Sequence, residues 1–324
     1  MRIRCGKRLD PVLFGADPGA NLPFVQAIST DSREVRRGDL FLALPGRRND
    51  GADFIADAFS RGASLVLTNR PCADRRAIRV PDPFDRVRDV AVHYAARIPH
   101  RTIGITGSYG KTTLRENLTR ILSRIIPTVS TPGNGNTDLA VTLSLLTMKP
   151  DARLFLAELG MRGRGEIARL SNLIHPDLAV ITAIGTSHIG RLGSREAICL
   201  AKCEISEGMK PDGFLLYPAG DPALSDAVAK LPVRKESVSI GSDVGTYSLV
   251  LRNASQKLVD LSGPGRTMRN VRLSDVSLPY LSCAAFSFAV CDQLGVEGDL
   301  FRKEIANISL PPMRQEKQIG RAHV

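Results

Sequence analysis

The sequence predicts an α/β protein: a small α/β N-terminal domain, residues 1–98, followed by a phosphate-loop domain, residues 99–324, with a mostly parallel central sheet covered by helices. Three observations predict this class. Short apolar strands alternate with helices along much of the 324 residues, which is typical of parallel sheets covered on both faces. A glycine-bearing turn joins one of these strands to the helix after it. Residues 232–277 change to alternating Val, Ser and Thr with many turns, which predicts an added antiparallel portion.

The N-terminal domain is predicted from short elements separated by glycine turns. Residues 38–46 form an apolar strand that enters a turn, residues 53–61 follow a helical pattern, and residues 64–67 form another strand. A helical pattern over about residues 84–97 then leads to Pro99. Because proline interrupts regular structure, we expect the domain boundary just before the next strand.

The most informative segment is Thr-Ile-Gly-Ile-Thr-Gly-Ser-Tyr-Gly-Lys-Thr-Thr at residues 102–113. It predicts a strand, a glycine turn and a helix start, an arrangement whose backbone N–H groups point at an anion. Lys111 adds a point charge, and the Thr112 hydroxyl is placed to reach a magnesium ion. The strict P-loop spacing needs a glycine where this chain has Ile105, so a tighter form of the motif remains. The predicted nucleotide-binding residues are Gly107, Ser108, Tyr109, Gly110, Lys111, Thr112 and Thr113.

The helix after this loop has an apolar face. Six residues at helical spacing form it: Leu114, Leu118, Ile121, Leu122, Ile125 and Ile126. The later elements are predicted as strands over residues 154–157, 178–182 and 214–217 and helices over about residues 194–209, 280–294 and 298–307. Because ligands of parallel sheets collect beyond the carboxyl ends of the strands, Glu158 and the segment around His188 lie where a nucleotide site is expected.

The net charge of +11 predicts anionic partners. The positive residues are mostly scattered arginines, and five tyrosines without a tryptophan offer few stacking platforms, so nucleotides account for the charge and no nucleic-acid partner is expected. No apolar run approaches the roughly 18 residues that a membrane helix needs, and no secretory signal pattern follows Met1. We therefore expect a cytoplasmic protein without membrane insertion. We also expect a monomer.

The six cysteines form no Cys-x-x-Cys pair, and a chain of this length needs no disulfides for stability. Cys199 and Cys203 lie one helical turn apart, which is half of a possible metal site, but two small buried residues are the simpler interpretation. All six are expected to be reduced and structural.

Several segments, in the same order, resemble the Mur ligases, which build the peptide of bacterial cell-wall precursors. The loop at residues 106–113 is similar to their ATP-binding turn. The segments at residues 131–138, 158–167 and 201–205, with His188 between the last two, are similar to those of the members that add D-Ala-D-Ala. Three upstream segments resemble the family's UDP-binding domain, at residues 30–33, 38–41 and 50–55.

The resemblance implies a ligase that uses ATP to convert the terminal carboxylate of a UDP-muramoyl tripeptide into an acyl phosphate, which the amine of D-Ala-D-Ala then attacks. Thr112 and Glu158 would hold Mg²⁺, and His188 would help to hold a second one. Lys202 matches the lysine that the family carbamylates, a reaction that needs a neutral amine. The remaining implied site residues are Asn134 and Asn136 near the phosphate and acceptor, Arg314 at the cofactor, and Thr30, Asp31, Ser32 and Arg33 at the UDP group.

Each of these residues also has an ordinary structural interpretation. Glu158 would be a surface carboxylate at a strand end, His188 a loop histidine, and Lys202 a solvated charge beside Glu204 and Glu207. The order of the segments and the phosphate loop favour the functional interpretation.

The chain also departs from the family pattern. Thr137 replaces an asparagine and Ala52 a histidine, and Ser282 and Cys283 occupy the place where the family reads adenine with an asparagine. The sequence ends ten residues after Arg314, where the family has a third domain that binds the amino acid and closes over ATP.

These departures predict a chain that binds nucleotide and UDP-sugar but does not turn over alone. Three alternatives stay open. One is a catalytically degenerate nucleotide- or UDP-sugar-binding module, another is a sister ligase that adds a different amino acid, and the most distant is a nucleic-acid-associated P-loop protein.

Overall fold

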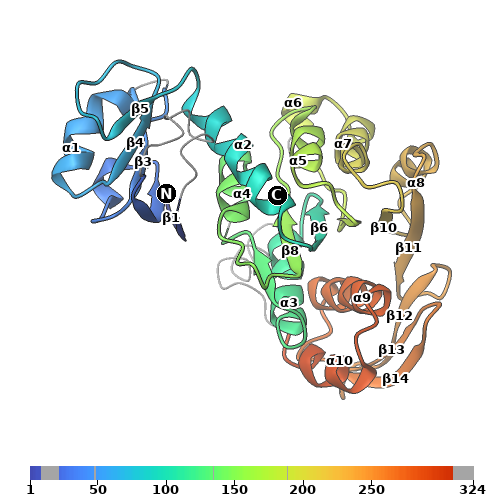
Figure 1. Ribbon diagram of the computed structural model, residues 1–324. Coiled ribbons are helices and arrows are strands. Elements are labelled where there is room, and N and C mark those ends of the chain that lie inside the picture. The colour runs from blue at the N-terminus through green and yellow to red at the C-terminus, as the bar shows by residue number, and fades with distance from the viewer. Residues whose placement is uncertain (9–21, 47–48, 134, 188, 309–324) are drawn as a thin grey trace. The chain divides into compact units, whose positions relative to one another are not determined.

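A computed structural model of the chain describes residues 1–8, 22–46, 49–133, 135–187 and 189–308 (Figure 1). These residues form two compact units. The first comprises Met1–Pro99 together with Asp138–Ala152, and the second comprises His100–Thr137 and the described residues from Arg153 onward. Each unit has its own sheet.

The first unit is built on a five-stranded sheet in the order β1-β2-β3-β4-β5. Its strands are β1 (Arg2–Arg8), β2 (Phe24–Ser29), β3 (Leu40–Leu42), β4 (Leu65–Thr68) and β5 (Ala77–Arg79). β1 pairs with β2 antiparallel, and the other neighbours are parallel. The predicted strands at residues 38–46 and 64–67 are confirmed as β3 and β4, whose residues are all buried, as expected for strands covered on both faces.

The helices of the first unit are short, apart from one. They are the 3₁₀ turns Ser32–Glu34 and Gly51–Phe54, and the helices α1 (Ile55–Ser60), α2 (Pro83–Ala96) and α4 (Asp138–Leu145), the last of which packs against α2. The prediction over residues 84–97 is confirmed by α2, where the Asp82 side chain accepts hydrogen bonds from the first-turn N–H groups and Pro83 occupies the first turn. The predicted helix at 53–61 begins instead as the Gly51–Phe54 turn, which Asp50 caps.

The second unit is built on a nine-stranded sheet in the order β14-β13-β12-β11-β10-β9-β6-β8-β7. Its strands are β6 (Arg101–Thr106), β7 (Thr128–Ser130), β8 (Leu154–Glu158), β9 (Leu178–Ile181), β10 (Phe214–Pro218), β11 (Arg234–Ile240), β12 (Tyr247–Asn253), β13 (Leu258–Ser262) and β14 (Thr267–Arg272). The three strands predicted at residues 154–157, 178–182 and 214–217 are confirmed.

The antiparallel portion is smaller than the sequence predicts. β11 pairs in parallel with both β10 and β12, and only β12, β13 and β14 are antiparallel to one another. The prediction was wrong for β11 because alternation reports which face of a strand is buried and does not report strand direction. The helix α8 (Pro222–Ala229) connects β10 to β11, and such a crossover returns the chain in parallel.

The other helices of the second unit are α3 (Lys111–Leu122), α5 (Glu166–Ile174), α6 (Ile189–Leu192), α7 (Arg195–Cys203), α9 (Leu278–Gln293) and α10 (Gly298–Ile305), with a 3₁₀ turn at Glu204–Ser206. α3 buries its first four predicted core residues. It ends at Leu122, so Ile125 lies beyond the helix and is 47% exposed, contrary to the prediction. The helix predicted over 194–209 is α7 followed by the 3₁₀ turn.

All six cysteines are free thiols, as predicted. Cys199, Cys203, Cys283 and Cys291 are buried, Cys5 is partly buried and Cys72 is exposed. Within the described residues, no group of three or more His, Cys, Asp or Glu side chains is arranged to hold a metal ion, and no helix is long and apolar enough to cross a membrane.

Candidate functional site

The predicted phosphate loop connects the end of β6 to the start of α3. Gly107 has a φ of +141° and Gly110 a φ of +81°, values that L side chains rarely adopt. A Cβ at Gly107 would lie 2.1 Å from Thr182 Oγ1, so the loop needs glycine there for space as well as for backbone conformation. The Lys111 ammonium donates a 2.8 Å hydrogen bond to the Gly107 carbonyl and so folds back over the loop.

Thr112 and Glu158 meet at the carboxyl end of the sheet. Thr112 Oγ1 donates a 2.8 Å hydrogen bond to Glu158 Oε2, and Asn136 Nδ2 donates a 3.1 Å bond to Oε1. The Glu158 backbone N–H donates to Thr131 Oγ1 at 3.0 Å. Glu158 is 1% exposed, so its interpretation as a surface carboxylate is excluded.

Arg115 is the residue of this cluster that sequence reasoning missed. It is 3% exposed, its Nη1 donates to the Thr131 carbonyl at 2.5 Å and its Nη2 to the Gly133 carbonyl at 2.9 Å. Its Nε lies 3.7 Å from Glu158 Oε2 and has no hydrogen-bond partner. The available signal was spacing: Arg115 follows Lys111 by four residues and Thr112 by three, so it shares their helix face.

Lys202, on α7, is buried to 2% exposure, contrary to the solvated interpretation. Burial, and secondarily the charge of Lys111, lowers the pKa of Lys202 to about 7. Glu204 does not pair with it: the Glu204 carboxylate accepts hydrogen bonds from the N–H groups of Gly165 and Ala168, at 2.8 and 3.3 Å. The site therefore contains a buried lysine with a fraction of neutral amine at pH 7.

The remaining loop residues differ in their surroundings. The Ser108 Oγ is buried without a hydrogen-bond partner, Thr113 is buried, and Tyr109 is 54% exposed. A cavity of about 550 Å³ lies beside the loop, and its lining includes Tyr109, Gly110 and Thr113 together with residues of α9. Asn134, His188 and Arg314, also predicted for the site, lie outside the described residues.

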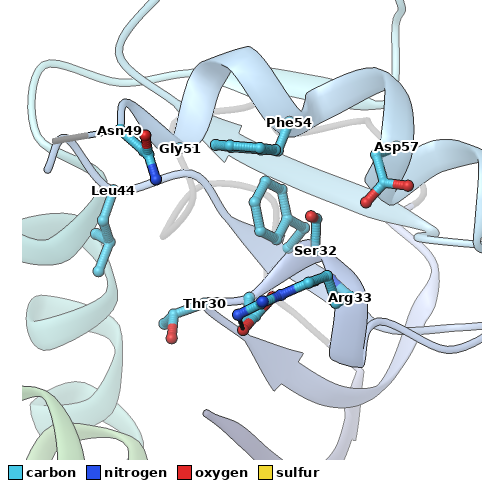
Figure 2. Close-up of a pocket in the computed structure, with 10 residues that line it drawn as sticks. Thr30, Ser32, Arg33, Leu44, Asn49, Gly51, Phe54 and Asp57 are labelled. Carbon is cyan, nitrogen blue, oxygen red and sulfur yellow. Dashed lines mark hydrogen bonds and ion pairs between the residues drawn. The ribbon is translucent and has the colours of Figure 1, made fainter.

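The predicted UDP residues line a cavity of about 530 Å³ in the first unit (Figure 2). Thr30, Asp31, Ser32 and Arg33 all border it. Arg33 holds Asp31 through two hydrogen bonds, Nε to Oδ1 at 2.9 Å and Nη2 to Oδ2 at 2.6 Å. The hydrogen bond from Arg33 lowers the pKa of Asp31 to about 2.

Asn49 and Asp57 of this cavity were missed by sequence reasoning, whereas Phe54 lies in the segment at residues 50–55 that resembles a UDP-binding domain. In Figure 2 the Phe54 ring and the Asn49 amide lie across the cavity from Thr30 and Arg33. Asp57 borders it as well, and hydrogen bonds from Ser32 and Arg61 lower the pKa of its carboxyl. Phe54 is 40% exposed, and an aromatic side chain left exposed at a cavity wall is a stacking surface.

Two family models match the chain: the Mur ligase middle domain over residues 105–268, and the Mur ligase family catalytic domain over residues 24–93. A UDP-N-acetylmuramoyl-tripeptide–D-alanyl-D-alanine ligase from Bacillus subtilis is 38% identical over 216 residues, 65% of this chain and 47% of the relative. The same-named ligase from Treponema pallidum is 35% identical over 314 residues, 92% of this chain and 65% of the relative.

Solved structures of ligases of the same kind are similar to the fold of this chain. MurF from Acinetobacter baumannii superposes with a TM-score of 0.77 at 30% identity, covering 88% of this chain and 63% of that one. The MurF ligase from Thermotoga maritima in complex with ADP gives 0.77 at 28% identity, with 88% and 66% covered. The chain thus spans about half to two thirds of the proteins that it matches. The match to the middle-domain model alone takes in half of the chain, and the chain belongs to the Mur ligase family.

Proposed function

We propose that the chain carries the nucleotide-binding and acceptor-binding parts of an ATP-dependent ligase that joins D-Ala-D-Ala to a UDP-N-acetylmuramoyl tripeptide. The observation that carries the proposal is the phosphate loop whose Thr112 hydrogen-bonds the buried Glu158. The names of the relatives from Bacillus subtilis and Treponema pallidum support the substrates. The ADP complex of the Thermotoga maritima ligase supports ATP as the cofactor.

The residues at the carboxyl end of the sheet fit Mg²⁺. Oxygen ligands suit this ion, which usually binds through one or two protein groups together with substrate phosphates. Glu158 supplies a buried carboxylate and Thr112 a hydroxyl 2.8 Å away. When bound, the ion would neutralise charge on the phosphates. Asn136 donates a hydrogen bond to Glu158 Oε1. This bond fixes the orientation of the Glu158 carboxylate before the ion binds.

Lys202 fits a carbamylated lysine. Its neutral amine attacks CO₂, a C–N bond forms, and one proton leaves, which gives an anionic carbamate suited to a second metal position. Burial favours the neutral amine that this reaction needs. By the family resemblance, His188 would share that position, and Asn134 and Arg314 would contact substrate and cofactor.

Catalysis in this proposal is positioning together with electrostatic stabilisation. The γ-phosphoryl group passes from ATP to the carboxylate of the tripeptide, ADP leaves, and the resulting acyl phosphate is attacked by the amine of D-Ala-D-Ala with release of phosphate. Lys111 and the N–H groups at the start of α3 stabilise the negative charge that develops on the phosphoryl oxygens. Arg115 holds the loop at residues 131–133 through two carbonyls.

The first unit would bind the UDP group. Arg33 offers a cation for the diphosphate and Phe54 a stacking surface for the uracil. In this division of roles, residues 1–98 hold the UDP-sugar end of the substrate and residues 99–324 hold ATP.

The test is thermal protection of the chain by each ligand separately. We expect both Mg·ATP and UDP-N-acetylmuramoyl tripeptide to raise the Tm, because a ligand that binds only the folded state stabilises it. Arg33→Ala should remove the shift from the UDP ligand alone, and Lys111→Ala the shift from Mg·ATP alone. A chain that neither ligand protects would exclude the proposed function. Protection by both without phosphate release, even with a full-length relative's remaining segment supplied, would favour a non-catalytic binding module.

A further inference from the structure

The cavity beside the phosphate loop has the position of a nucleobase site. It lies within the second unit, and its lining includes Tyr109, Gly110 and Thr113 of the loop region as well as Ser282 and Phe286 of α9. A nucleotide whose phosphates rest on the loop would place its base here. At about 550 Å³ the cavity has the size of a small-molecule site.

Two of the side chains that line this cavity are large, mainly apolar and exposed to solvent. Tyr109 is 54% exposed and Leu278 is 67% exposed, although both are apolar side chains that line the cavity. The Tyr109 ring packs directly on Gly185, where a Cβ would lie 2.1 Å from a ring carbon. The ring is thus held in place against the backbone. Stacking on such a ring accepts any base, because every base has a π-face.

The polar side chains that line the cavity are uncharged and end in a hydroxyl or a thiol group. Among its described lining residues there is no carboxylate, amide or cationic side chain, and the polar groups are hydroxyls and the Cys283 thiol. The Thr182 hydroxyl already donates to the carbonyl of Tyr109. Burial raises the pKa of Cys283 to about 12, so it stays a weakly polar thiol. The Ser282 hydroxyl has no hydrogen-bond partner among the described residues.

A hydroxyl can either donate or accept a hydrogen bond, so it selects between bases less strongly than a group that can do only one of the two. Adenine presents an amino donor and a ring acceptor where guanine presents a carbonyl acceptor and a ring N–H donor. A fixed group would be left unsatisfied by the wrong base, at a cost of about 1–3 kcal/mol or roughly 5–150-fold in affinity. A hydroxyl rotates to donate or accept and so meets either edge.

We propose that this cavity binds purine nucleoside triphosphates without selecting adenine over guanine, with Ser282 as the rotatable group at the base edge and Tyr109 as the stacking platform. This inference rests on the proposed function only in taking the loop as the triphosphate site.

Calorimetric titration of the whole chain with Mg·ATP and Mg·GTP tests it. We expect the two Kd values to agree within about fivefold, which is the smallest difference that one mismatched fixed group would produce. Ser282→Ala and Tyr109→Ala should each weaken both nucleotides by similar factors. Val244→Ala is the matched control, since Val244 is 84% exposed and does not line the cavity.

The outcomes are distinct. A preference for ATP above about fivefold, or a loss on Ser282→Ala confined to one nucleotide, overturns the absence of base selection and leaves the proposed ATP site standing. No binding of either nucleotide to the wild-type chain overturns both the inference and the proposed function.

Discussion

Thr112 and Glu158, 46 residues apart in the sequence, are joined by a 2.8 Å hydrogen bond between Thr112 Oγ1 and Glu158 Oε2. One residue starts the helix after the phosphate loop, and the other ends the neighbouring strand β8. β6 and β8 pair in parallel, with Ile105 beside Glu158. Because parallel strands end at the same edge, this register brings the hydroxyl and the carboxylate together.

The first prediction concerns the charge of Glu158. Glu158→Gln keeps the shape and an acceptor for Thr112 but removes the negative charge that a cation needs. We expect the Mg²⁺-dependent part of ATP affinity to fall by at least about tenfold, measured by titration with and without Mg²⁺. Glu207→Gln, at an exposed carboxylate, is the control. An unchanged Mg²⁺ dependence in Glu158→Gln would remove Glu158 from the metal site.

The second prediction is a pH dependence of stability. The folded pKa of Lys202, about 7, lies below its ordinary value of 10.5, so the unfolded chain binds the extra proton between these values. Wild-type stability should therefore rise with pH across this window. Below pH 7 the full cost of burying the amine applies, of order 3–5 kcal/mol.

Lys202→Met, which keeps the apolar bulk, should accordingly be more stable than wild type at pH 7 in bicarbonate-free buffer, and the gain should disappear near pH 10. Urea unfolding at several pH values measures it. Lys230→Met, at an exposed lysine, should show no such trend. A gain in stability that does not depend on pH would show that the pKa of Lys202 does not differ between the folded and unfolded chain.

The third prediction is carbamylation of Lys202. With a pKa of about 7, about half of the amine is neutral at pH 7, against about one part in 3000 for an ordinary lysine. In ¹³C-bicarbonate the wild-type chain should give a carbamate NMR signal at this pH. Lys202→Met should lose that signal and Lys230→Met should keep it. A signal that survives in Lys202→Met belongs to another amine.

The fourth prediction concerns the turn of the phosphate loop. Gly107→Ala places a Cβ 2.1 Å from Thr182 Oγ1 at a φ of +141°, so the loop must shift. We expect a lower Tm and no protection by Mg·ATP. Gly190→Ala meets no atom within 4 Å and should leave both unchanged. Normal ATP protection in Gly107→Ala would show that phosphate binding does not depend on this turn.

The fifth prediction concerns the cavity of the first unit. Phe54→Ala removes the proposed stacking surface and should weaken UDP by about 5–150-fold, the 1–3 kcal/mol typical of base stacking. Val92→Ala, an exposed apolar residue outside the cavity, is the control. Equal UDP affinity in wild type and Phe54→Ala would place the uracil elsewhere.

The sequence was sufficient for β3, β4, β8, β9 and β10, for the phosphate loop and for the start of α3, because these depend on local patterns. It also indicated that Glu158 lies at the carboxyl end of a strand. The family resemblance implied that Thr112 and Glu158 share an ion, but local patterns did not show their direct contact, because it depends on the pairing of β6 with β8, two distant segments.

The burial of Arg115 and Lys202 was not predictable in the same way. Both are cations in helices with acidic neighbours in the sequence, the usual sign of solvent exposure. Both side chains are nevertheless buried. Arg115 donates hydrogen bonds to the carbonyls of Thr131 and Gly133. Glu204 accepts hydrogen bonds from two backbone N–H groups and does not pair with Lys202. Partners of this kind come from other segments, so no local pattern reports them.

We infer that the loop at Lys111 binds the triphosphate of a nucleotide for ligase chemistry. Titration of Mg·ATP into the wild-type chain and into Lys111→Ala tests it most directly. We expect measurable binding to wild type and an affinity at least about tenfold weaker in Lys111→Ala, with both chains still unfolding in one cooperative transition. Identical affinities in the two chains would contradict it.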